Sequence, residues 1–239
     1  MITGIKKLLR STAVLVTLLS VTILQTAAAE EINPDPWEGF NRTIFTFNDT
    51  LDRYALKPLA QGYQAVTPDI VEDGIGNFFS NLSDVVSFVN NLLQAKGTAA
   101  TEDFLRVTFN STFGLAGFID VATPMGLPEH NEDFGQTLGY WGMDTGPYLV
   151  LPLLGPSNIR DGIGLIPDAY LDPVGQVDHV RTRNVLYGTR IIDTRASLLA
   201  AESLLIGDRY TAMRDAYLQR REFMVNDGEV DADFDDDQF

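Results

Sequence analysis

The sequence predicts a mainly α-helical, exported and acidic protein, and three observations carry this prediction. Apolar residues recur at helical spacing on both sides of an irregular middle segment. Of the 239 residues, 45% are hydrophobic and 21% are charged, a composition typical of a globular chain. The first thirty residues differ from the rest, because a basic start is followed by an apolar run.

Residues 1–29 are predicted to be a cleavable signal peptide. Three basic residues lie within residues 1–10, a mostly apolar run covers 11–24, and Ala-Ala-Ala at 27–29 forms an A-x-A cleavage site. An uncleaved membrane anchor is the alternative, but a spanning helix needs about 20 apolar residues. Cleavage removes three of the 17 basic residues and none of the 33 acidic ones, which leaves a net charge of −19. We therefore expect one acidic domain over residues 30–226, in the periplasm or at the surface of a prokaryotic cell.

The first part of this domain is predicted to hold three helices. The first carries a mostly aromatic stripe and ends before Pro58; the stripe consists of Phe40, Ile44, Phe47, Leu51 and Tyr54. The second is expected to begin with Thr67 as its cap and to be closed by Gly97, with an apolar stripe of Phe78, Leu82, Val85, Val89 and Leu92. The third starts at Thr98 or Thr101 and runs to about residue 112.

The middle of the chain is predicted to be irregular. Residues 113–179 contain more than half of the glycines and prolines, which favours loops, short strands and short helices. Within them, residues 147–156 read PYLVLPLLGP. Ten residues interrupted by a proline are too short to span a bilayer as a helix, so we expect this segment to be buried or interfacial.

Beyond residue 179 the helical pattern returns. Apolar doublets recur about every seventh residue and predict one long helix that ends at Gly207. Asp208 is predicted to cap a last helix, with an aromatic side and with arginines that point elsewhere, namely Arg209, Arg214, Arg220 and Arg221. Residues 227–239 include seven acidic side chains and are predicted to form a disordered tail.

Composition and motifs exclude several classes of function. The strongly acidic balance argues against nucleic acid as a partner, since phosphate binding needs a basic face. The absence of cysteine excludes disulfides and thiol chemistry, and no phosphate-binding glycine loop occurs. His130, with Glu129, Glu132 and Asp133, could bind a metal or act as a base, but a solvated loop is the commoner meaning. We expect no catalytic site, no metal and no cofactor.

An ordered series of motifs resembles the MlaA (VacJ) family of outer-membrane phospholipid-transport proteins. The series begins with DPWEGFNR at 35–42 and continues with NSTFG at 110–114, EDFGQTLG at 132–139, GPYLVLP at 146–152 and GPSNIRD at 155–161. It ends with RASLL at 195–199 and RDAYLQR at 214–220, so it covers nearly the whole predicted domain.

The resemblance implies a ring-shaped bundle of amphipathic helices, in the inner leaflet of the outer membrane, that encloses a channel. Misplaced phospholipids would pass through it to a periplasmic lipid carrier of the same pathway, and the family associates with trimeric porins. No enzymatic activity is implied. Carried over position by position, the channel candidates are Asn41, Arg42, Gln136, Thr137, Tyr140, Arg160 and Asp161.

One departure from the family concerns the membrane anchor. Many members carry an acylated cysteine at the cleavage site, whereas this sequence has none, so we expect helix faces and porin contact to hold it at the membrane. A soluble periplasmic lipid carrier or envelope scaffold is the first alternative. A lipid hydrolase that uses His130 as its base is the second.

Overall fold

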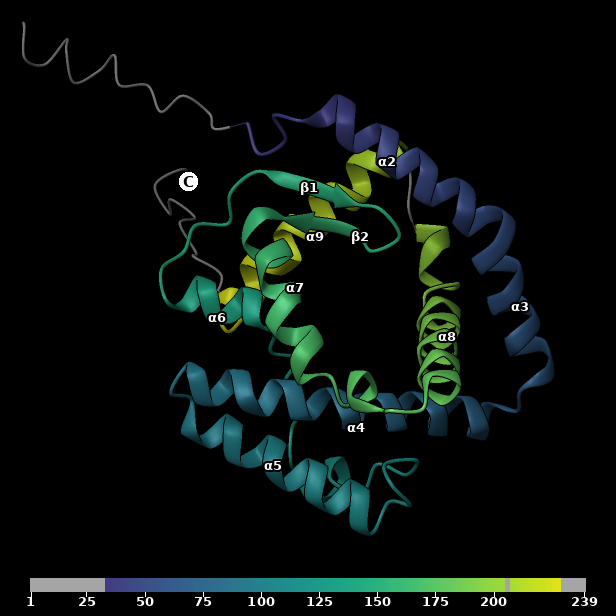
Figure 1. Ribbon diagram of the computed structural model, residues 1–239, viewed down its shortest axis with the longest axis vertical. Coiled ribbons are helices and arrows are strands. Elements are labelled where there is room, and N and C mark those ends of the chain that lie inside the picture. Colours follow the sequence, from purple (N-terminus) through teal and green to yellow (C-terminus); the bar gives the residue numbers. More distant parts are fainter. Residues whose placement is uncertain (1–32, 205–206, 229–239) are drawn as a thin grey trace, which may run out of the picture. The chain divides into compact units, whose positions relative to one another are not determined.

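The structure is a computed structural model that describes residues 33–204 and 207–228 (Figure 1). The chain divides into two units, Met1–Pro34 and Asp35–Phe239. The predicted signal peptide and all but the first two residues of the predicted acidic tail lie outside the described residues. All helices and strands described lie in the second unit.

The helix with the aromatic stripe continues farther than predicted. α2 (Glu38–Leu51) passes through a π-helical turn (Asp52–Leu56) into α3 (Lys57–Val66), so the expected end before Pro58 is wrong. In the wider turn, the Lys57 N–H donates to the Asp52 carbonyl five residues back. Pro58 then falls in the first turn of α3, where its missing N–H and fixed φ are tolerated.

The next two helices lie side by side. α4 (Asp69–Leu93) and α5 (Gly97–Thr112) pack against each other along their lengths. In Figure 1, α4 lies between α5 and the other helices. The N-cap of α4 is Pro68 and not the predicted Thr67, because Pro68 is the last residue with an extended backbone before the helix. Gly97 is the first residue of α5, and that helix ends at Thr112 as predicted.

The irregular middle contains short elements, as expected, and one longer helix. These are a 3-10 turn (Thr123–Met125), α6 (Phe134–Tyr140), β1 (Tyr148–Leu151), β2 (Gly155–Asn158), α7 (Ile159–Leu171) and a 3-10 turn (Pro173–Gln176). The two strands form an antiparallel hairpin in which Tyr148 pairs with Asn158 and Leu151 with Gly155. The PYLVLPLLGP segment is this hairpin: Tyr148 and Val150 are buried, whereas Leu153 and Leu154 at its tip are exposed.

Two glycines allow α6 and α7 to pack backbone against backbone. A Cβ atom added to Gly164 would lie 2.5 Å from the backbone nitrogen of Gly135. A Cβ added to Gly135 would lie 2.5 Å from Oδ1 of Asp161. Any larger side chain at either position would therefore separate these two helices.

The last third differs from the prediction in the length of one helix. α8 (Val180–Ser197) ends well before Gly207, and a 3-10 turn (Ala201–Leu204) follows it. Glu202 in this turn is held by Arg195 at 2.8 Å and by Lys57 at 3.1 Å, and these ion pairs turn the chain away from the helix axis. α9 (Arg209–Val225) is capped by Asp208, which accepts from the Tyr210 N–H, so the predicted cap is confirmed.

The prediction of a mainly α bundle is confirmed, and contacts between its elements form a closed circuit. α2 contacts β1, β2 contacts α9, α9 contacts α6, and α6 contacts α4. α4 then contacts α8, α8 contacts α3, and α3 leads back through the π turn to α2. Figure 1 shows α8 and α7 on opposite sides of this circuit. Each helix of the circuit therefore has one side toward its inside and one toward its outside.

Burial is inverted relative to a water-soluble protein. Among the described residues, nine apolar side chains are buried, eighteen polar or charged side chains are buried, and thirty-one large apolar side chains are exposed. α4 is an example: its buried residues include Asn81, Asp84, Ser87 and Asn91, while Leu92 of its predicted apolar stripe is exposed. Within residues 33–204 and 207–228, every helix is too short or too polar to cross a bilayer.

Candidate functional site

Two asparagines of α2 hold the hairpin in place. Asn41 donates to the Tyr148 carbonyl at 3.0 Å and accepts from the Val150 N–H at 2.9 Å. Asn48, two turns further along, donates to the Leu151 carbonyl at 2.9 Å and accepts from the Leu153 N–H at 2.8 Å. Their amides take the place of a neighbouring strand on the free edge of β1.

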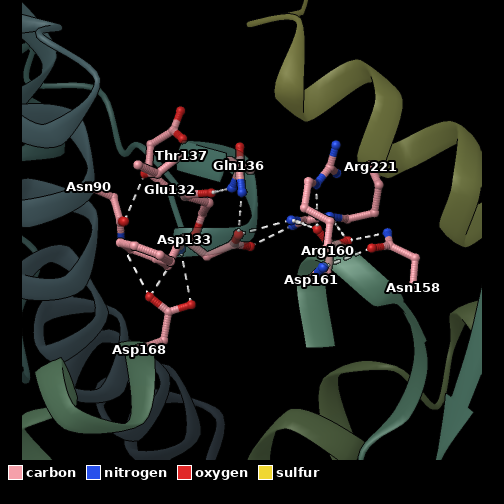
Figure 2. A network of polar contacts seen from close by, with 12 residues as sticks. Asn90, Glu132, Asp133, Gln136, Thr137, Asn158, Arg160, Asp161, Asp168 and Arg221 are labelled. Atoms are coloured by element: carbon pink, nitrogen blue, oxygen red, sulfur yellow. Dashed lines mark hydrogen bonds and ion pairs between the residues drawn. The ribbon is translucent and has the colours of Figure 1, made fainter. Parts of the chain in front are cut away.

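A network of buried charges ties α6, α7 and α9 together (Figure 2). Arg221 of α9 binds Asp133 through two nitrogens at 2.5 and 2.9 Å, and it binds Asp161 through Nη2 at 2.9 Å. Arg160 adds a contact from Nε to Asp161 at 3.1 Å. Two guanidiniums pair with two carboxylates, which compensates the buried charges of Arg160, Asp161 and Arg221, while Asp133 is partly exposed.

Asp161 is the most heavily bonded member of this network. It accepts from the Tyr217 hydroxyl and from the Asn158 amide, each at 2.6 Å. Burial alone would raise the pKa of Asp161, but the hydrogen bond from Tyr217 and the nearby guanidinium of Arg221 outweigh it and lower the pKa. Asp161 is therefore a carboxylate, and it holds the start of α7 against α9.

Amides and hydroxyls join α6 to α4 on the other side of the network. Thr137 donates to Oδ1 of Asn90 at 2.8 Å and accepts from the Gln94 amide at 3.0 Å. Asp168 of α7 accepts from the Phe134 N–H at 3.1 Å, and burial raises the pKa of this carboxyl to about 6. Figure 2 shows this cluster and the charged network on either side of Asp133 and Gln136.

The structure brings together some of the predicted channel residues and separates others. Arg160, Asp161 and Thr137 are buried in the clusters above, and Gln136 is buried beside them, where its amide donates to the Asn131 carbonyl at 2.7 Å. Arg42 instead lies between α2 and the start of α9, where it pairs with Glu38 at 2.6 Å and Asp208 at 2.7 Å and lies over the Tyr210 ring. Tyr140 is half exposed at the end of α6.

The residues around His130 do not converge. His130 lies 2.8 Å from Glu102, Glu129 accepts from Ser80, Glu132 accepts from Gln94, and Asp133 binds Arg221. Among the described residues, no group of three histidine, aspartate or glutamate side chains is arranged to hold a metal ion.

Three cavities adjoin the buried clusters. The first, of about 340 Å³, lies between α2, the hairpin and the start of α9. The second, about 280 Å³, shares Pro156 with the first, and the third, about 450 Å³, shares Asp133, Leu154, Leu165 and Asp168 with the second. The walls of the second and third cavities combine charged groups of the network with leucine side chains, so a molecule with a polar and an apolar part can be accommodated.

Several members of the network were not predicted from the sequence. Arg221 was predicted to point away from the packed side of its helix but is buried, because it reaches two carboxylates on α6 and α7. Asp133 and Asn158 each stand three residues before a residue whose N–H they accept, as N-caps of α6 and α7. The spacings Asp133-x-x-Gln136 and Asn158-x-x-Asp161 were signals that could have located both helix starts.

This mainly α architecture, with a polar interior and an apolar exterior, defines a class of protein suited to contact with lipid. The family model described as MlaA lipoprotein matches residues 33–224, and the chain belongs to this family. An "Intermembrane phospholipid transport system lipoprotein MlaA" of Haemophilus influenzae is 37% identical over 202 residues, covering 82% of this chain and 81% of the relative. The protein of that name in Escherichia coli K12 is 34% identical over 232 residues, covering 94% and 91%.

A solved structure supports the same assignment. It is reported as "Structural basis for maintenance of bacterial outer membrane lipid asymmetry", and its chain is 36% identical to this one. The TM-score is 0.71, with 80% of this chain and 99% of that chain covered. The relatives are named lipoproteins, which leans against the prediction that this chain is held without an acyl anchor; the 239 residues contain no cysteine.

Proposed function

We propose that this protein is an outer-membrane component of intermembrane phospholipid transport. In this proposal it lies in the inner leaflet, gives misplaced outer-leaflet phospholipids an amphipathic path toward the periplasm, and so maintains lipid asymmetry. The observation that carries the proposal is the inverted burial, with thirty-one large apolar side chains exposed and eighteen polar ones buried among the described residues. Family membership supports it.

The exposed apolar side chains suit an environment of acyl chains. Phe40, Phe47 and Tyr54 of the aromatic stripe are 56%, 53% and 79% exposed. Water would penalise so much apolar surface, whereas lipid tails would not. A flat position in one leaflet also requires no spanning helix.

The interior suits a phospholipid in transit. The charged network and the amides offer partners for a head group, and leucines in the same cavities offer contact to acyl chains. Asn41 would keep the hairpin beside this path, and Arg160 and Asp161 would keep α7 in place. Gln136 and Thr137 would fix α6. Arg42 and Tyr140 would lie at the two outer margins of the path. Nothing in this mechanism requires covalent chemistry, so we propose no enzymatic activity.

The proposed path for phospholipids implies two protein partners. Lipid that leaves on the periplasmic side needs a soluble carrier, and we propose that a periplasmic lipid carrier of the same pathway receives it. A trimeric porin, together with the apolar helix faces, would hold the protein at the membrane. Labelling cells with a clickable fatty acid tests whether an acyl chain is attached as well.

The test is the phospholipid content of the outer leaflet in a deletion strain. The native gene should reverse accumulation, whereas a gene lacking residues 30–239 should not. No accumulation in a strain without a second copy would contradict the proposal. Extraction with carbonate separates it from the soluble-carrier alternative, which predicts release of the protein from membranes.

A further inference from the structure

The first cavity differs from the other two in its lining. It lies where α2, the hairpin, the end of α8 and the start of α9 meet, and its volume is about 340 Å³. It is open to the surface of the protein on one side. A space of this volume falls in the range of small-molecule sites, roughly 300 to 1,000 Å³.

The base of the cavity is apolar and its rim is charged. Phe45, Val150 and Met213 line the base. At the rim, Arg195 binds Asp52 at 2.6 Å and Glu202 at 2.8 Å, and these contacts come from its Nε and Nη2 atoms. Arg209 binds Asp49 at 2.7 Å.

This polarity fits one end of an amphiphile. The apolar base offers no hydrogen-bonding group to water, and an apolar cavity tends to stay dry and to take up hydrocarbon. A guanidinium has five N–H donors, and the contacts of Arg195 to Asp52 and Glu202 come from Nε and Nη2. Guanidinium groups suit phosphate oxygens.

We propose that this cavity holds one acyl chain of a phospholipid, with its zwitterionic head group at the rim: the phosphate at Arg195 and Arg209, and the ammonium group at Asp49, Asp52 and Glu202. The inference rests on the proposed function and adds a defined resting site to it. Because the cavity shares Pro156 with the second cavity, a lipid held there is next to the polar network. The second acyl chain would remain outside, toward the exposed Leu198 at 53% exposure.

The experiment uses phosphatidylethanolamine with a diazirine near the end of one acyl chain. The purified full chain is irradiated with this lipid in detergent, and labelled peptides are mapped by mass spectrometry. We expect labels on the peptides that contain Phe45 and Met213. Met213→Trp should reduce this labelling about fivefold or more, because a larger side chain occupies the space. Met125→Trp, the same change at an exposed position, should leave the labelling unchanged.

Leu198→Trp at the mouth of the cavity is a second variant if Met213→Trp fails to fold. Labels confined to other peptides, or labels that neither cavity variant reduces, would overturn the inference. The lipid assay in cells separates this result from the proposed function. Restored asymmetry with the native gene, together with no label in the cavity, would overturn the resting site alone. Failure of the native gene to restore asymmetry would overturn the proposed function, and the labelling would still decide the cavity.

Discussion

Replacing Asp161 by alanine should weaken the fold more than any surface substitution, because four side chains lose a shared partner. Asp161 accepts from Tyr217 and Asn158, and it binds Arg160 and Arg221, which are 3% and 8% exposed. Removing one member of a buried ion pair costs about 3–5 kcal/mol, because the other charge is left uncompensated. Arg221 retains Asp133, which keeps the cost from being larger.

This loss converts to a measurable melting shift. For a domain of about 200 residues, 1 kcal/mol shifts the melting temperature by roughly 2–4 °C, so Asp161→Ala should melt about 6–20 °C below the native protein. Circular dichroism in detergent micelles measures the shift. Asp161→Asn keeps the shape of the side chain and loses its charge, so its melting temperature should lie between those of the native protein and Asp161→Ala.

Asp215→Ala is the matched control. Asp215 is half exposed and pairs with its neighbour Arg214 at 2.8 Å, and exposed pairs contribute about 1 kcal/mol or less. If Asp161→Ala and Asp215→Ala have the same melting temperature, the network does not stabilise the interior as proposed. If Asp161→Ala remains folded and lipid export is also unchanged, the role proposed for Asp161 is wrong as well.

Four further outcomes are expected. Because burial raises the pKa of Asp168 to about 6, its protonation is favoured in the folded state, and stability should rise as pH falls from 7 to 5; melting curves of Asp168→Asn should show a smaller rise. Asn48→Ala removes two hydrogen bonds to the hairpin, so it should cost about 1–3 kcal/mol and increase proteolysis at the hairpin tip. Gly117→Ala meets a side chain at 2.8 Å and should lower the melting temperature more than Gly126→Ala, which has a positive φ but open space. His130→Ala should restore lipid asymmetry as the native gene does, and failure to do so would favour the hydrolase alternative.

The sequence predicted the helices better than it predicted their buried faces. The spacing of Phe78, Leu82, Val85 and Val89 identified α4, and helical periodicity alone indicates that one face is apolar. In water that face would be the buried one. Here Asn81 and Asp84 are fully buried while these four apolar side chains are only partly buried, and this cannot be read from one helix, since it depends on what surrounds the assembled helices.

The contacts of the site depend on residues far apart in the chain. Arg221 reaches Asp133 across 88 positions, and Asn41 reaches Val150 across 109. Local patterns carry no information on such pairs. The caps at Asp133 and Asn158 are local, and they were predictable; α7 was missed because Pro167 and its glycines resemble a loop.

The polar interior also agrees with the lipid environment that we propose for this protein. Acyl chains are as apolar as leucine, so apolar burial gives helices no reason to associate within them. Close packing and hydrogen bonds must then hold the helices together. Both are present where function is proposed: Gly135 and Gly164 bring α6 and α7 into backbone contact, and Asp161 and Arg221 join them to α9. The same groups that stabilise the helices therefore supply the polar wall that a phospholipid head group would meet, so variants that weaken the network should impair folding and transport together.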